Sequence, residues 1–289
     1  MENYSHFIIT RFNLNLYAQD KHDLPTRTDR WLEHRFEVFE RYCLPSVAAQ
    51  TSGNFTWLCL FDAATPEPYR SRIEGYKARC PQFEAVYYTA AQAANLTENL
   101  RTTITAYVSC DRKGRKSPPP KLLITTNLDN DDAFSSDVVE LLQRELRPAP
   151  GKRIYSLLYG YLYFTDRRFA LKMRYTNNHF LTLAEPFDAH TETIISYRHT
   201  KAIRQLPTTY LSTARGKWLE IVHEDNVSND FRINIKVWYI PLLYGRSFAD
   251  FGLGGFRLSC ARQWAATLLV VPARFFATAV RRLRRKWSK

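Results

Sequence analysis

Apolar residues in the first part of the chain alternate between short strand-like runs and a helical period. Residues 7–12 form an apolar run of the length of a buried strand, and residues 55–61 form a second one that ends at Asp62. Between them, five apolar positions recur at spacings of three and four, which places them on one face of a helix: Leu32, Phe36, Phe39, Cys43 and Val47. This order of strand, helix and strand predicts two parallel strands.

The predicted helix has recognisable ends. Thr28 or Asp29 is suited to cap its start. Pro45 is expected to bend or interrupt its last turns, because proline has no amide hydrogen to donate.

The same alternation continues to residue 126. Residues 69–79 fit a helix, 83–88 a strand, 96–108 a second helix and 122–126 a further apolar strand. Such repetition predicts an α/β fold of the doubly wound kind, with a mostly parallel central sheet and helices on both of its faces.

Later segments differ in pattern. Residues 138–146 fit a helix that Ser136 or Asp137 can cap. Between residues 153 and 197, aromatic and β-branched residues predict hairpins, including 154–164 and 169–174, so the second half should add antiparallel strands. An apolar strand at 219–222 follows.

Composition and charge narrow the class of protein. With 289 residues and 45% hydrophobic content, the chain can bury one substantial core. The five cysteines are widely spaced without a C-x-x-C pair, and the N-terminus lacks a secretory signal, so we expect reduced thiols and a cytoplasmic protein. Residues 251–289 hold nine Lys or Arg and no acid, and 13 − 9 leaves a net charge of only +4 on the first 250 residues. The basic character therefore belongs mainly to the tail.

An acidic cluster carries the most chemistry in this sequence. Asp129, Asp131 and Asp132 lie within four positions, directly after the strand at 122–126. Carboxylates crowded together repel one another and favour a hard cation such as Mn²⁺ or Mg²⁺, which proteins often hold together with substrate phosphates. In open α/β sheets, ligands bind beyond the carboxyl ends of the strands, where this cluster falls. The alternative is an acidic turn that caps the next helix.

The acidic cluster belongs to a recognisable motif, because Leu128-Asp129-Asn130-Asp131-Asp132 is similar to the D-x-D element of GT-A glycosyltransferases. No P-loop, nucleophile elbow, H-E-x-x-H or G-x-G-x-x-G motif competes with it. Five further stretches have counterparts in the same order: residues 6–13, 31–37, 39–47, 55–62 and 218–229. On these stretches, the chain resembles the rhamnosyltransferase-like family of bacterial polysaccharide enzymes.

The resemblance implies roles for particular residues. Asp131, assisted by Asp129 or Asp132, would hold a metal on the diphosphate of the donor, and Asp62 would contact the nucleotide base. Thr10 and Arg11 are placed to contact the nucleotide, whereas Asn127 stands where the family is expected to have arginine.

Three further candidates come from chemistry and position. His223 follows the strand at 219–222 and is suited either to complete the metal shell or to hydrogen-bond within its own loop. Glu185 is the candidate base for the acceptor hydroxyl, and Asp188 and Glu192 compete with it. His199 is suited to steer phosphate or acceptor, or to lie in a solvated loop.

The pattern of the C-terminal segment predicts that it associates with a membrane surface. Trp264, Leu268, Val271 and Phe275 repeat at helical spacing before the basic run at 281–287. Pro272 and Arg274 interrupt the apolar stretch, so a basic amphipathic helix on an anionic bilayer fits better than a transmembrane helix. A helix packed on the domain with a soluble basic end is the alternative.

Taken together, these features predict a GT-A domain at residues 1–240 and a membrane-associating segment at 241–289. The expected activity is a metal-dependent and inverting transfer of a sugar from a UDP- or dTDP-sugar to a glycan or lipid-linked glycan of a bacterial surface polysaccharide, on the inner face of the cell membrane. Rhamnose and galactofuranose are both open as donor sugars. A non-catalytic membrane-surface adaptor is the alternative. Nucleic-acid binding is a third hypothesis and is not the expected one.

Overall fold

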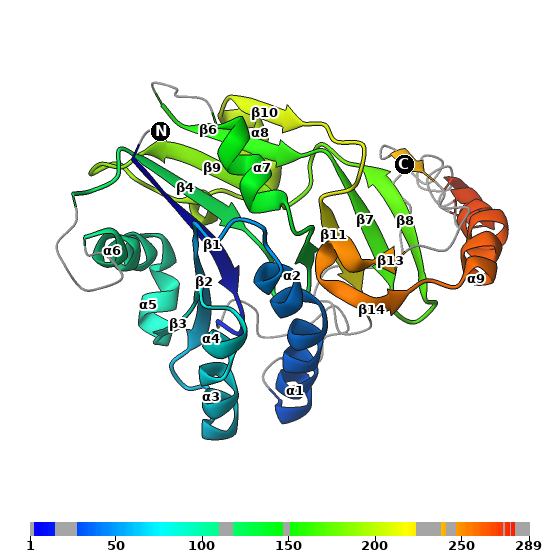
Figure 1. Cartoon of the computed structure of the whole chain (residues 1–289), viewed down its shortest axis with the longest axis horizontal. Helices are drawn as coiled ribbons and strands as arrows, with labels where there is room; N and C mark the ends of the chain where they lie inside the picture. The colour runs from blue at the N-terminus through cyan, green and yellow to red at the C-terminus, as the bar shows by residue number, and fades with distance from the viewer. Residues whose placement is uncertain are drawn as a thin grey trace, which may run out of the picture.

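The buried apolar runs assemble into a seven-stranded sheet (Figure 1). This computed structural model describes residues 3–14, 28–109, 118–146, 151–223, 238–240, 247–273, 275–277 and 279–280. Parallel pairs join β4, β1, β2 and β3 and also β10 and β6, whereas β9 is antiparallel to both of its neighbours. The strand order is β10 (Thr208–Leu211), β6 (Arg153–Leu157), β9 (Leu181–Pro186), β4 (Leu122–Asn127), β1 (Tyr4–Arg11), β2 (Thr56–Asp62) and β3 (Phe83–Tyr88).

Helices cover both faces of this sheet. Ile8 of β1 packs toward one face, and its neighbours Phe7 and Ile9 pack toward the other, as the alternation of a strand requires. The face of Ile8 is covered by α1 (Asp29–Val38), α2 (Leu44–Ala48), α3 (Glu67–Glu74), α4 (Tyr76–Arg79) and α7 (Val138–Glu145). The other face is covered by α5 (Ala90–Ala94), α6 (Leu96–Val108), the 3₁₀ turn η2 (Ile194–Ser196) and α8 (His199–Gln205). The predicted α/β class with a mostly parallel sheet is confirmed.

Pro45 shapes the helix that follows β1. The Thr28 hydroxyl caps α1 by accepting a hydrogen bond from the Trp31 amide at 3.2 Å. Between α1 and α2, the π-helical turn η1 (Phe39–Cys43) widens the helix, and the Leu44 amide donates to the Phe39 carbonyl. A wide turn just before Pro45 accommodates a residue that has no amide hydrogen, so the predicted interruption takes the form of a π-bulge.

The second half of the chain builds a separate five-stranded sheet. Its order is β12 (Trp238–Ile240), β8 (Phe169–Arg174), β7 (Tyr159–Phe164), β11 (Trp218–Val222) and β5 (Ala133–Phe134). The predicted strand at 169–174 forms a hairpin with β7. The predicted hairpin at 154–164 is wrong, because β6 pairs with β9 in the first sheet while β7 pairs with β8 and β11 in the second.

Trp218 of β11 joins the two sheets. Its indole nitrogen donates to the Leu157 carbonyl at 2.8 Å, and its ring stacks on Phe180 with centroids 4.8 Å apart. Gly160 of β7 makes this contact possible, since a Cβ there would lie 1.9 Å from the Trp218 ring.

The last described segments pack on the outer face of the second sheet. β13 (Ser247–Phe248), the 3₁₀ turn η3 (Ala249–Phe251) and β14 (Leu253–Arg257) bury Phe248 and Phe251 against Tyr161. The helix α9 (Cys260–Ala265) and the π-helical η4 (Ala266–Val270) follow. The Gln263 side chain ties α9 to β8 through both backbone groups of Ala170, at 2.8 and 3.0 Å. The packed part of the chain therefore extends past residue 240.

Candidate functional site

The acidic loop Leu128–Asp132 lies where the order of the parallel strands reverses. From β1, the chain builds β2 and β3 on one side and then places β4 on the other side of β1. At such a switch point the connections leave the sheet in opposite directions, which opens a crevice at the carboxyl ends of the strands. Arg11 at the end of β1 and Asp129 after β4 meet there, with Nη2 3.8 Å from Oδ1.

Asp131 points to one side of the loop, toward α1. Its carboxylate lies 3.3 Å from Arg35 Nη1 and 3.3 Å from His223 Nε2. Burial by itself would raise the pKa of Asp131, but the hydrogen bond from His223 and the charge of Arg35 lower it to about 2. Two of the predicted metal ligands, Asp131 and His223, thus lie together, although Arg35 shares the carboxylate.

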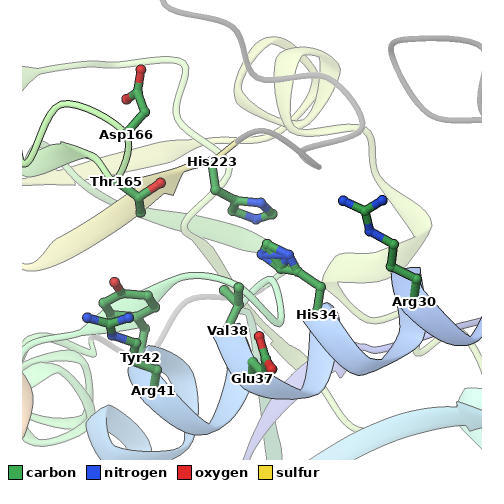
Figure 2. Close-up of a pocket in the computed structure, with 9 residues that line it drawn as sticks. All are labelled: Arg30, His34, Glu37, Val38, Arg41, Tyr42, Thr165, Asp166 and His223. Carbon is green, nitrogen blue, oxygen red and sulfur yellow. The ribbon is translucent and has the colours of Figure 1, made fainter.

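His223 separates Asp131 from a cavity of about 440 Å³ beside α1. Figure 2 shows the His223 ring facing that of His34, with Arg30 nearby, and the ring centroids are 5.2 Å apart. Thr165 and Asp166, in the turn after β7, line the same cavity. Positive and negative side chains both line this cavity, among them Arg30 and Asp166. Its charge therefore favours neither an anionic nor a cationic ligand.

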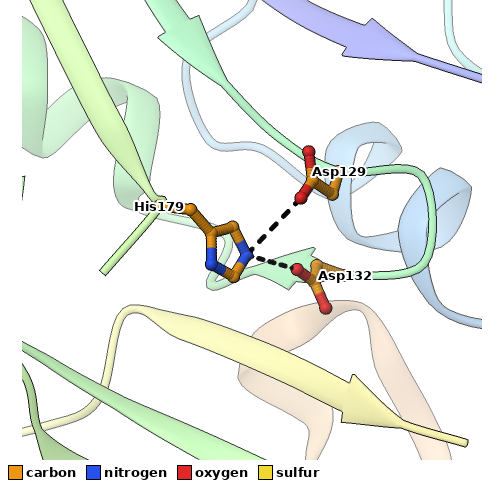
Figure 3. Close-up of side chains that lie close together, drawn as sticks. All are labelled: Asp129, Asp132 and His179. Atoms are coloured by element: carbon orange, nitrogen blue, oxygen red, sulfur yellow. Dashed lines mark hydrogen bonds and ion pairs between the residues drawn. The ribbon is translucent and has the colours of Figure 1, made fainter. Parts of the chain in front are cut away.

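Asp129 and Asp132 point to the other side of the loop and converge on His179 (Figure 3). His179 Nε2 lies 2.7 Å from Asp132 Oδ2 and 3.8 Å from Asp129 Oδ2. One ligand atom from each of the three residues lies within 4.8 Å of the other two. The Ile221 amide donates to the second Asp132 oxygen at 2.9 Å, which fixes the carboxylate in place.

This group fits a divalent cation. Carboxylate oxygens and an imidazole nitrogen are ligands that Mn²⁺ accepts. Burial alone would lower the pKa of His179, but its hydrogen bond to Asp132 and the charge of Asp129 raise that pKa to about 10. Burial also raises the pKa of Asp132, so the pair of His179 and Asp132 holds a proton, and a bound cation would take the place of that proton. Asp129, Asp132 and His179 would hold the metal.

Asp129 and His179 of this group line a pocket of about 750 Å³. Arg11 lines it too, together with residues 194–200, which include His199 at the start of α8. The Arg11 Nε atom is buried and has no hydrogen-bond partner in the described part of the chain. A guanidinium that lines a pocket beside a carboxylate cluster suits a diphosphate bound together with a cation.

Glu220 is a second acid in this pocket, and no sequence pattern singled it out. It lies in the middle of β11, between two residues of the apolar core. Burial raises the pKa of Glu220, although the charge of His179 opposes this.

Two predicted nucleotide contacts have different surroundings. The Thr10 side chain is buried in the core and accepts a hydrogen bond from the Trp57 indole at 2.9 Å, so its position argues against a direct contact. Asp62, at the end of β2, accepts from the Ala64 amide at 2.7 Å and is partly exposed. Its contact with the base stays a prediction.

The structure does not bring the predicted base to the acidic loop. Glu185 pairs in β9 with Leu123, at the opposite end of β4 from Asp129. Its buried carboxylate accepts from the amides of Glu192 and Thr193 and lies 3.5 Å from Lys152 Nζ. These contacts shape the loop that lines the pocket and argue against a role as base. Asp188 is exposed and holds the turn at His190, so it is not in the pocket either.

Sequence reasoning missed His179 and Glu220 for one reason. His179 stands in a polar loop between two apolar stretches and resembles a turn residue, while Glu220 looks like the polar member of an alternating strand. Only the crossing of the two sheets places them beside Asp129 and Asp132. The one available signal was their chemistry, an imidazole in a loop between two apolar stretches and a carboxylate within a predicted strand.

One protein family and several solved structures are similar to this chain. A family model described as "Putative rhamnosyl transferase" matches residues 9–235. No curated protein matches the sequence. Among solved structures, a "putative nucleotide-diphospho-sugar transferase" from Desulfovibrio desulfuricans G20 is 11% identical with a TM-score of 0.34, over 78% of this chain and 84% of that one. Mouse xyloside xylosyltransferase 1 in its apo form is 13% identical with a TM-score of 0.26, over 54% of each chain.

Proposed function

The chain belongs to the "Putative rhamnosyl transferase" family, and from that membership we propose that it is a glycosyltransferase that uses a divalent cation, Mn²⁺ or Mg²⁺, and a UDP- or dTDP-sugar. The observation that carries the metal dependence is the convergence of Asp129, Asp132 and His179 beside the pocket at the switch point. Bacterial surface polysaccharide, of the O-antigen or capsule type, is the proposed product.

The chain's own residues have distinct tasks in this proposal. A bound cation supplies positive charge that stabilises the departing nucleoside diphosphate. Arg11, which lines the pocket, contacts the diphosphate through its guanidinium, and Asp62 contacts the nucleotide base. Asp131, held by Arg35 and His223, fixes the loop that carries Asp129 and Asp132. Transfer with inversion of the anomeric centre is proposed, since a carboxylate in the pocket can serve as base.

Coupled binding of metal and nucleotide tests the proposal. In calorimetric titrations of the full chain, UDP or dTDP should bind at least about tenfold more tightly with Mn²⁺ than with EDTA, because a cation held by Asp129, Asp132 and His179 would supply positive charge for the diphosphate. The same protein should bind an oligonucleotide no more tightly with Mn²⁺. Nucleotide affinities that are equal with and without metal would remove the basis for a metal-dependent transferase, and an adaptor would then be the better interpretation.

We also propose that the C-terminal segment, which begins with α9 and η4, docks on an anionic bilayer. Six apolar side chains of this segment are exposed: Trp264, Leu268, Leu269, Phe275, Phe276 and Val280. Water-exposed apolar side chains gathered on one element mark a contact surface. The basic run at 281–289 lies outside the described residues and adds the positive charge that anionic lipids attract. No helix in the described part of the chain is long and apolar enough to cross a membrane.

Removing two exposed leucines should weaken this docking. Burial of a leucine contributes about 1.5 kcal/mol, and about 1.4 kcal/mol is a factor of ten. Leu268→Ser/Leu269→Ser should therefore bind vesicles of phosphatidylglycerol and phosphatidylcholine roughly 100-fold more weakly in a sedimentation assay. Tyr210→Ser removes an exposed aromatic from the edge of the seven-stranded sheet and should change nothing. Equal sedimentation of both variants would contradict docking through this helix.

A further inference from the structure

Glu220 occupies a position that a structural role does not explain. Successive residues of a strand point to opposite faces, so Glu220 shares a face of β11 with Trp218 and Val222. Both of these side chains pack in the main apolar core, whereas Leu219 and Ile221 pack on the other face of the sheet. A carboxylate on the core-facing side of a central strand costs stability unless something polar pairs with it.

The residues that the structure describes around Glu220 provide no such partner. Its carboxylate has no hydrogen bond with any of them, and its electrostatic neighbours include His179, Asp131 and Asp129. His179 is already paired with Asp132 at 2.7 Å. Glu220 instead lines the 750 Å³ pocket together with Asp129 and His179, so its carboxylate is open to a ligand in the space beside the proposed metal group.

Glu185, Asp131 and Asp132, the buried acids among the described residues, all have hydrogen-bond partners, which makes Glu220 distinct. Glu185 accepts from two backbone amides, and Asp131 and Asp132 are each bonded to a histidine. The Asp137 carboxylate is bonded to Ser135 and Lys217. It therefore does not cap α7, although the sequence suggested Asp137 as a candidate cap. A partly buried carboxylate that lines a ligand pocket, and that no donor among the described residues holds, is suited to accept a proton from a ligand hydroxyl.

We propose that Glu220 is the catalytic base that takes the proton of the acceptor hydroxyl. This inference rests on the proposed function. The acceptor oxygen forms a bond to the anomeric carbon of the donor sugar while its proton passes to the Glu220 carboxylate. The bond from that carbon to the phosphate oxygen breaks, and the nucleoside diphosphate leaves with the bonding electron pair. No oxidant or other reactant is needed.

Substitution of the carboxylate by an amide tests this role. Glu220→Gln keeps the size and polarity of the side chain but cannot accept the proton. Release of nucleoside diphosphate from a panel of UDP- and dTDP-sugars, in the presence of a bacterial glycolipid extract and Mn²⁺, should fall at least about 100-fold in kcat. Affinity for UDP with Mn²⁺ in calorimetry should stay within about threefold of the original chain. Glu220→Asp should recover part of the rate, because it restores a carboxylate at a shorter reach.

The controls separate the two proposals. Glu84→Gln makes the same change on β3, at the far edge of the seven-stranded sheet, and should leave the rate unchanged. If the original chain shows no metal-coupled nucleotide binding or no release, the proposed function itself fails. If the original chain is active and Glu220→Gln releases nucleotide as fast, Glu220 is not the base. Loss of both UDP affinity and rate in Glu220→Gln would also overturn the inference, since it would mean that Glu220 organises the donor site.

Discussion

Replacement of Asp129 by asparagine should lower sugar transfer roughly 100- to 1000-fold, the loss expected when a group that stabilises developing charge is removed. The Asp129 side chain is 38% exposed, so the substitution should change the free energy of unfolding by less than about 0.5 kcal/mol. Calorimetry should show that UDP no longer binds more tightly when Mn²⁺ is added. The rate and the metal dependence of binding should therefore fall together while the thermal midpoint stays in place.

Two further aspartate-to-asparagine variants serve as comparisons for Asp129→Asn. Asp188→Asn changes an exposed turn residue outside the pocket and should leave transfer unaffected. Asp131→Asn tests the role that the family resemblance implies, and asparagine is preferable to alanine there, because alanine would leave the buried Arg35 guanidinium without its acid partner. If metal-coupled binding survives in Asp129→Asn and is lost in Asp131→Asn, the cation belongs with Asp131 and His223 rather than with His179.

Replacement of Gly160 by alanine should destabilise the whole domain. The added Cβ would lie 1.9 Å from the Trp218 ring, which is itself fixed by Phe180 and by the Leu157 carbonyl. Overpacking against side chains that cannot move costs roughly 3 kcal/mol or more, which corresponds to a fall in Tm on the order of 10 °C. Because Trp218 lies two residues from Glu220, transfer should fall as well.

A second glycine provides the comparison for this variant. Gly254 in β14 has no heavy atom within 4 Å of a built Cβ, so Gly254→Ala should leave the Tm within about 2 °C. Differential scanning calorimetry of the two variants measures the difference directly. If the Tm of Gly160→Ala equals that of the original chain, Trp218 does not fix the junction of the two sheets.

Local pattern was sufficient for most of the secondary structure. The strands at 83–88 and 169–174 and the helix at 96–108 have the bounds that the hydrophobic period predicts. The period fails at 154–164, where both halves are apolar and extended but diverge after Leu157 into different sheets. Which strand pairs with which is a long-range property, and alternation within one segment carries no information about it.

By itself, then, the sequence determined the α/β alternation, the acidic loop after β4 and the concentration of basic charge in the tail, because each of these depends on residues close together in the chain. The tertiary structure decided which groups accompany that loop. It placed His179 and Glu220 beside Asp129 and Asp132, paired Asp131 with Arg35 and His223, and buried Glu185 at the far end of the sheet. These contacts join residues dozens of positions apart, and only the pairing and crossing of the two sheets brings them within bonding distance.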